Sequence, residues 1–348
     1  MEHRQWTDKA YGALLGLAMG DAIGFPAMYH RGLNASWTRS QMWKFSRQAD
    51  ENRINKFAIP FSLTQEEEAM DLCGTDDTEY AVVSALMLLE TAGIPELGQL
   101  EEGWKRYVRD HAETIWSGVS ERVAIDNAAQ GLRAPATGND NPHHFDDGAV
   151  GRAVPIGIRF HGRPDVAASV AADMASITNA EDGVYAAQAM AASIAVAMRG
   201  ASPQEAVEAG LAFVPDNSWT GRKIRQAIEI AEHADTPIAA VPLWHSLVAN
   251  RIYNFGNIAP ETLAVSYGIL LSTSGDLQQA IQLAALVPKQ ADSMPAMVGA
   301  LAGAIQGSAA IPPSWVGLLD EVKGICVPHT KGLSLRSIAE RLVMEENE

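Results

Sequence analysis

Residues 12–26, GALLGLAMGDAIGFP, carry a glycine at every fourth position. These glycines lie at 12, 16, 20 and 24, and a second row with the same period lies at 299, 303 and 307. A spacing of four places residues on one face of a helix, and each glycine costs about 1 kcal/mol relative to alanine there. We therefore predict two helices whose glycine faces allow close backbone approach to a neighbour. Tight core packing alone is the simplest explanation of such rows.

The same helical pattern extends over much of the chain. In 76–90, DDTEYAVVSALMLLE, the apolar residues form the broad stripe of a buried helix. Alanine is abundant, and no run of alternating β-branched residues indicates a sheet. We expect further helices over 186–198, 222–234, 261–271, 276–286 and 296–306, and loops over 133–148, 214–221 and 287–295. The prediction is one all-α domain spanning 1–348, with an irregular excursion over about 30–73.

The composition restricts the class of protein. The 348 residues are 47% hydrophobic and 20% charged, which is enough apolar material for a core. The net charge of −16 does not favour a nucleic-acid duplex as partner. Two cysteines, Cys73 and Cys326, cannot build a disulfide framework. The N-terminus does not read as a signal peptide and no stretch favours a membrane span, so we expect a cytoplasmic protein. Nothing in the sequence indicates an oligomeric state.

Carboxylates and hydroxyls gather at predicted helix ends. Thr75-Asp76-Asp77-Thr78 begins one helix, Asp21 ends the first glycine row, and Asp292-Ser293 precedes the second. Capping explains one carboxylate at a helix start but does not readily explain two adjacent ones. Hard cations such as Mg²⁺ or Mn²⁺ bind this mixture of oxygen atoms. If the helix ends converge, Thr75, Asp76, Asp77, Asp292 and Ser293 can form one oxygen-rich site.

Six segments, in order, resemble the ADP-ribosylglycohydrolase family. They are GALLGLAMGDAIGFP (12–26), GTDDTEYAVVSALMLLE (74–90), DGAVGRAVPIGI (147–158), TNAEDGVYAAQAMAASIAVAM (178–198), GNIAPETLAVSYGILLSTSGDLQQAIQLAAL (256–286) and PKQADSMPAMVGALAGAIQG (288–307). The resemblance implies an all-α, orthogonally packed globule with a Mg²⁺ or Mn²⁺ site at the base of a cleft. It also implies hydrolysis of a glycosidic bond at the anomeric carbon of an ADP-ribosyl group.

The resemblance also assigns roles to particular residues of this sequence. The implied metal ligands are Thr75, Asp76, Asp77, Asp292 and Ser293. Of these, Asp76, Asp77 and Asp292 are the expected catalytic residues. The expected substrate-binding residues are Asp21, Asp147, Gly148, Arg152 and Asn179. The expected partner is a small-molecule or ADP-ribosylated substrate, and we expect neither a nucleic-acid duplex nor a membrane.

Several positions depart from the family pattern. The second metal motif usually reads Gly-Gly-Asp-X-Asp-Thr, and residues 288–293 read Pro-Lys-Gln-Ala-Asp-Ser. Gln290 therefore replaces a carboxylate, and Lys289 adds a positive charge beside it. Met28 stands where a glutamate is usual, and Asn179 stands where a histidine is usual. With two carboxylates fewer, we expect one divalent ion rather than two.

Alternatives remain at two levels. His143-His144 with Asp146-Asp147 could be a second metal patch, a solvated polar loop or a loop that covers the cleft. Arg152 could meet a phosphate or carboxylate, or be a surface arginine. For the whole chain, the first hypothesis is a metal-dependent hydrolase of a ribosyl N- or O-glycosidic bond. The others are a non-catalytic reader of ADP-ribose or nucleotides, and a structural protein whose acidic clusters are caps.

Overall fold

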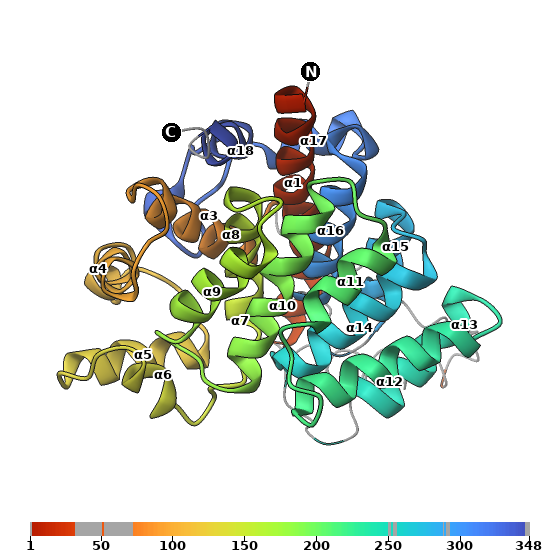
Figure 1. Ribbon diagram of the computed structural model, residues 1–348, viewed down its shortest axis with the longest axis horizontal. Helices are drawn as coiled ribbons and strands as arrows, with labels where there is room; N and C mark the ends of the chain where they lie inside the picture. The colour runs from red at the N-terminus through yellow and green to blue at the C-terminus, as the bar shows by residue number, and fades with distance from the viewer. Residues whose placement is uncertain are drawn as a thin grey trace.

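The protein is described here from a computed structural model, which covers residues 2–31, 51, 72–249, 252, 256–287, 289 and 293–344 (Figure 1). Within these ranges the regular elements are helices, and the only β-pairing is an isolated bridge between Glu321 and Ser334. The prediction of an all-α fold is confirmed. The described part of the chain contains no helix that is both long and apolar enough to cross a membrane. Most of the excursion expected over 30–73 lies outside the described residues.

The first half of the chain contains a long helix followed by shorter ones. These are α1 (Glu2–Arg31), α3 (Asp76–Leu89), α4 (Leu97–Tyr107), η3 (Arg109–His111), α5 (Val119–Ala129), α6 (Ala136–Asn139), α7 (Gly148–Arg152), α8 (Val154–Arg159) and α9 (Pro164–Ala175). The second half comprises α10 (Asp182–Ala197), α11 (Pro203–Leu211), α12 (Trp219–His233), α13 (Pro237–Leu243), η4 (Trp244–Ala249), α14 (Ala259–Ser272), α15 (Leu277–Ala285), α16 (Ser293–Gln306), η5 (Ser308–Ala310), α17 (Pro313–Leu319), η6 (Pro328–Thr330) and α18 (Leu335–Met344).

Two helices begin earlier than the sequence pattern indicated, inside segments that were predicted to be loops. The segment 287–295 was expected to be a loop, but α16 begins at Ser293. Pro295 lies in the first turn, where its missing N–H has no intrahelical partner to lose. Similarly, α12 begins at Trp219 inside the expected loop 214–221, because the Ser218 side chain accepts a hydrogen bond from the N–H of Gly221 and caps the helix.

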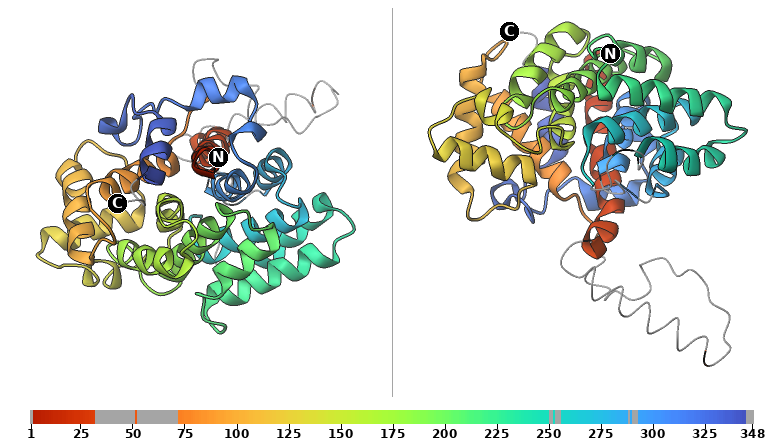
Figure 2. Two further views of the ribbon diagram at one scale, coloured as in Figure 1. Left: turned by 45° about the horizontal axis from the view of Figure 1, so that its top comes forward. Right: turned by 90° about the horizontal axis from the view of Figure 1, so that it is seen from below.

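The two glycine rows face each other across the interface between α1 and α16. A Cβ atom on Gly16 would overlap the carbonyl oxygen of Gly299, and a Cβ on Gly299 would overlap that of Gly16. A Cβ on Gly20 would overlap the carbonyl of Pro295 in the same way. The prediction of close backbone approach is therefore confirmed. Figure 2 (left) shows α1 nearly end-on, between the orange α3 and the blue helices of the C-terminal part.

Helix α10 lies near the middle of the molecule and packs against α7, α8, α9, α11, α14 and α16 (Figure 1). Its sequence, DGVYAAQAMAASIAVA, is apolar on nearly every face, as expected of a helix surrounded by others. Met190 and Ile194 have no exposed surface. Seven of its 16 residues are alanine, so neighbouring helices can lie close around it.

Three helices that carry predicted site residues, α3, α7 and α16, contact one another, and α14 joins them. The short helix α7 packs against α3, α14 and α16, and α16 also packs against α3 and α14. Asp76 and Ser293 are the first residues of α3 and α16, Asp147 immediately precedes α7, and Thr262 lies in the first turn of α14. The fold therefore brings these four helix starts, from distant parts of the sequence, into one region.

Candidate functional site

The start of α3 is capped by a carboxylate from another helix. Asp21 of α1 accepts hydrogen bonds from the backbone N–H of Thr75 at 2.6 Å and from that of Thr78 at 3.0 Å. It also accepts from the hydroxyls of both threonines, with a Thr78 Oγ1 distance of 2.6 Å. Asp21 has no exposed surface, and its burial raises the pKa of the carboxyl while the four hydrogen bonds oppose that shift. Asp21, which we expected to bind substrate, lies beneath the Thr75–Thr78 turn.

The two aspartates of the motif occupy different environments. Asp77 is 8% exposed, and a Cβ on Gly151 of α7 would lie 3.0 Å from its Oδ1 atom. Asp76 is partly exposed, and its Oδ1 lies 3.2 Å from the Thr75 hydroxyl. The absence of a side chain at Gly151 therefore leaves room for the Asp77 carboxylate. The motif presents one buried and one more accessible carboxylate at the same helix start.

Glu79 is a buried residue of this region whose role the sequence did not reveal. It has no exposed surface and accepts hydrogen bonds from three consecutive backbone N–H groups, those of Ile325, Cys326 and Val327, at 2.8, 2.8 and 2.5 Å. Burial raises the pKa of its carboxyl, and the three hydrogen bonds oppose the shift. Glu79 thus fastens the segment 325–327 to α3. Its partners lie about 250 residues away in sequence, so no local pattern could have indicated them.

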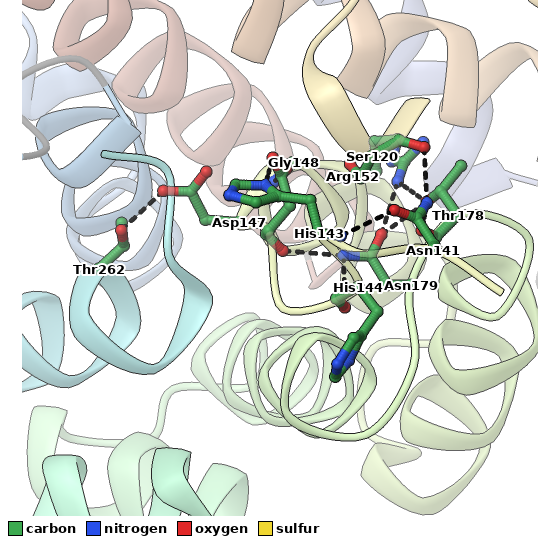
Figure 3. Close-up of polar contacts among 11 residues, drawn as sticks. Ser120, Asn141, His143, His144, Asp147, Gly148, Arg152, Thr178, Asn179 and Thr262 are labelled. Atoms are coloured by element: carbon green, nitrogen blue, oxygen red, sulfur yellow. Dashed lines mark hydrogen bonds and ion pairs between the residues drawn. The ribbon is translucent and has the colours of Figure 1, made fainter. Parts of the chain in front are cut away.

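Asp147 is also buried and contacts α14. It is 1% exposed, and its Oδ2 accepts a hydrogen bond from the Thr262 hydroxyl at 2.6 Å (Figure 3). The neighbouring Asp146 accepts from the N–H of Gly148 at 2.8 Å, and its other oxygen lies 3.2 Å from Nδ1 of His143. His143, Asp146 and Asp147 are all less than 9% exposed, so the solvated-loop interpretation of this segment is wrong.

Arg152 takes part in an internal polar network. It is 7% exposed, forms an ion pair with Glu121 and donates to the Thr178 hydroxyl. The carboxylate of Glu121 also accepts from the indole N–H of Trp104. The surface-arginine alternative is therefore wrong, because the guanidinium meets a buried carboxylate. Figure 3 shows Arg152 and Thr178 on the opposite side of the loop from the Asp147–Thr262 contact.

Asn179 connects this network to the loop before α7. Its side-chain amide donates to the carbonyls of His144 at 3.1 Å and Asp146 at 2.9 Å, and its oxygen accepts from the Thr178 hydroxyl at 2.6 Å. The residue has no exposed surface. Asn141 supports the same loop by donating to the carbonyls of Ser120 and Thr178, each at 2.9 Å. Asn179 therefore holds the loop that carries Asp147 and Gly148, and Arg152 contacts Asn179, with a guanidinium nitrogen 3.4 Å from its side-chain oxygen.

The second predicted metal motif is described only in part. Ser293, the first residue of α16, is 5% exposed, and Lys289 is 8% exposed. Asp292 and Gln290 lie outside the described residues, as does the side chain of Met28. Among the residues that are described, no group of three or more His, Cys, Asp and Glu side chains is arranged to hold a metal ion.

A buried ion pair lies beside this motif. The Lys289 ammonium is 2.6 Å from Oε2 of Glu261, and Glu261 has no exposed surface. Glu261 immediately precedes Thr262, the residue that binds Asp147. The sequence indicated the positive charge at Lys289, but it did not indicate the buried carboxylate that accepts it.

Comparison with known proteins agrees with this architecture. The sequence model of the ADP-ribosylglycohydrolase family matches residues 2–348. ADP-ribosylarginine hydrolase Tri1 of Pseudomonas putida (strain GB-1) is 26% identical over 322 residues, which are 90% of this chain and 74% of the relative. An uncharacterised protein of Archaeoglobus fulgidus is 27% identical over 320 residues, covering 90% of this chain and 92% of that protein.

A solved structure supports the fold. The protein described as an ADP-ribosylglycohydrolase-related protein complex matches with a TM-score of 0.60 and 24% identity, and the match covers 98% of each chain. The all-α fold of this type, expected from the six resembling segments, is confirmed. Because the family model matches nearly the whole sequence, this chain belongs to the ADP-ribosylglycohydrolase family.

Proposed function

We propose that this protein is a metal-dependent hydrolase that cleaves an N- or O-glycosidic bond to ribose, in an ADP-ribosyl conjugate or a related riboside. Family membership supports the reaction class. One structural observation supports placing the catalytic site at the start of α3. Asp21 supplies the cap of this helix, so capping does not account for the adjacent Asp76 and Asp77.

The donor atoms at this helix start suit one Mg²⁺ or Mn²⁺ ion. The Thr75 hydroxyl donates a hydrogen bond to Asp21, so the lone pairs of its oxygen remain for a cation. Asp76 and Asp77 add carboxylate oxygens, which hard divalent ions prefer. We expect Ser293 and Asp292 to complete the ligand set from α16. A bound divalent ion would orient the ribose hydroxyls and lower the pKa of a bound water molecule.

The remaining residues have distinct proposed roles. The carboxylates of Asp76 and Asp77 would stabilise positive charge that develops on the ribose as the glycosidic bond breaks. Asp147 and Gly148 are proposed to bind substrate at the start of α7. Arg152 and Asn179 would act as positioning residues, because their polar atoms already bind Glu121, Thr178 and the 144–146 backbone. Asp21 would orient Thr75 without touching the substrate.

The test is product release from a panel of conjugates. The purified full-length chain, with Mn²⁺ present, would be incubated with ADP-ribosyl-arginine, ADP-ribosylated peptides carrying other linkages, and simple ribosides. We expect free ADP-ribose or ribose from at least one compound, detected by chromatography and mass spectrometry. Asp77→Asn should reduce the rate by about 100-fold or more. Asp110→Asn, at an exposed position of η3, is the matched control. No turnover of any compound would contradict the proposal.

A non-catalytic ADP-ribose or nucleotide reader is the second candidate. This candidate is favoured by Gln290 and Met28, which replace carboxylates of the family pattern, and by Asn179, which replaces a histidine. The buried ammonium of Lys289 adds to these departures. This alternative predicts that ADP-ribose raises the melting temperature in proportion to the logarithm of its concentration, without any conversion of conjugates. Sustained product formation over many turnovers would exclude it.

A further inference from the structure

The ion pair between Lys289 and Glu261 is buried and lies beside the second predicted metal motif. Glu261 has no exposed surface, Lys289 is 8% exposed, and the two charged groups are 2.6 Å apart. Charges removed from water are retained only where each compensates the other. The pair therefore acts as a unit, in which removal of either group leaves an uncompensated buried charge.

The helix turn that carries Glu261 is connected to the Asp77 carboxylate through α7. Glu261 is adjacent in sequence to Thr262, whose hydroxyl binds Asp147 at the start of α7. Gly151 of the same short helix packs against Asp77, with 3.0 Å between the position of an added Cβ and Oδ1. The first turn of α14, which binds the ammonium through Glu261, therefore contacts the short helix that lies against the Asp77 carboxylate.

A second connection links the ion pair to α16. Lys289 precedes Ser293, the first residue of α16, by four positions. The hydroxyl of Ser266, one turn after Glu261 and Thr262, lies 3.4 Å from the carbonyl oxygen of Met294. The first turns of α14 and α16 are thus adjacent, and the Lys289 ammonium reaches Glu261 of α14 from the segment just before α16.

The charge of this segment differs from that of the family pattern it resembles. At the second and third positions of Gly-Gly-Asp-X-Asp-Thr, this chain has Lys289 and Gln290. One negative charge is therefore lost and one positive charge is gained within two adjacent residues. A second divalent cation would meet fewer carboxylates and the repulsion of a fixed ammonium.

We propose that Lys289 supplies a permanent cation in place of a second divalent ion, so that the site binds one ion only. Glu261 is the counter-charge that holds the ammonium in position. Lys289 is then a positioning residue, since its ammonium neutralises Glu261 beside the site and touches no substrate. This inference rests on the proposed function in one respect, which is that the first ion binds at Thr75–Asp77.

The experiment counts metal ions. The full chain would be equilibrated with Mn²⁺, and bound metal would be measured by elemental analysis after equilibrium dialysis, with electron paramagnetic resonance to detect spin-coupled pairs. We expect one Mn²⁺ per wild-type chain and no spin-coupled signal. The double variant Lys289→Gly with Gln290→Asp should bind two Mn²⁺ and show a coupled signal, because Glu261 and the new carboxylate then require a cation.

The controls separate a specific effect from a general loss of stability. Lys105→Ala removes an ammonium 3.5 Å from Glu101, which is 5% exposed and lies on α4, and it should keep one Mn²⁺. If the double variant is unstable without metal, its melting temperature should rise more with Mn²⁺ than that of the wild type. A double variant that still binds a single ion would overturn the inference.

The wild-type result distinguishes the two proposals. Two Mn²⁺ ions per wild-type chain would overturn the role of Lys289 and leave a metal-dependent hydrolase intact. No Mn²⁺ bound to the wild-type chain would overturn the metal-dependent function and this inference with it. One Mn²⁺ in the wild type and two in the double variant would support both.

Discussion

The carboxylate of Asp21 accepts hydrogen bonds from both the backbone N–H and the hydroxyl of Thr75, although 54 residues separate the two in sequence. This contact connects α1, which is fixed by its glycine face against α16, to the start of α3, where Asp76 and Asp77 are presented. The packing of two glycine-rich helices and the geometry of the candidate site are therefore mechanically linked.

Asp21→Asn should weaken both the fold and the site. The amide has one acceptor oxygen in place of two, and its NH₂ group would face N–H donors of the α3 start, so a buried donor is left unsatisfied. We expect a loss of about 1–3 kcal/mol in the free energy of unfolding. Urea denaturation measures that loss, and Mn²⁺ titration should show weaker binding. Asp110→Asn at the surface serves as control, and an unchanged Asp21 variant would contradict the capping role.

Gly16→Ala should destabilise the protein because the new methyl group would overlap the Gly299 carbonyl, which cannot move without separating the helices. We expect a cost of at least about 1–3 kcal/mol, as for overpacked cores. Gly98→Ala provides the comparison, because no atom lies within 4 Å of the added Cβ on α4. That variant should be neutral or more stable by up to about 1 kcal/mol. Equal effects of the two substitutions in thermal denaturation would contradict the close-packing argument.

Arg152→Met should be strongly destabilising, since it leaves the Glu121 carboxylate buried without its cation. Breaking such a pair costs about 3–5 kcal/mol. Adding Glu121→Gln to Arg152→Met should recover part of that loss, which a double-mutant cycle would measure.

The matched surface pair is Arg106 with Glu90, whose side chains are 62% and 37% exposed. Arg106→Met should cost only about 0–1 kcal/mol. If Arg152→Met were equally mild, the internal network would not be a significant source of stability.

Because His161 is buried, we expect the free energy of unfolding to fall in acid. Burial, together with the charge of Arg199, lowers the pKa of His161 below its ordinary value of 6.5. At pH values between the lowered pKa of the folded state and 6.5, the unfolded chain binds more protons than the folded chain. The free energy of unfolding therefore falls as pH decreases below 6.5. His161→Gln should flatten this part of the curve of stability against pH, measured by denaturant titration. Exposed His233→Gln should leave the curve unchanged, and a wild-type slope in the His161 variant would refute the assignment.

Parts of the site could be predicted because their signals are local. The pair Asp76-Asp77 at a helix start, and the spacing of Gly12, Gly16 and Gly20, follow from residues within a few positions of each other. The bonds of Glu79 to the 325–327 backbone and of Lys289 to Glu261 left no such signal. A glutamate or lysine on an apolar background looks the same in sequence whether it faces solvent or a partner on another helix.

The sequence by itself determined that the fold is helical, the positions of several helices, the two glycine faces and the acidic motif, because helix periodicity and turn chemistry act over three or four residues. Only the tertiary structure decided that the glycine rows pack on each other, that Asp21 caps α3, and that Arg152 meets Glu121 in the interior. These pairings join residues that are tens to hundreds of positions apart. They depend on which helices contact one another and on which side chains become buried. A charged group that is buried loses its contact with water, so its partner must lie within the fold.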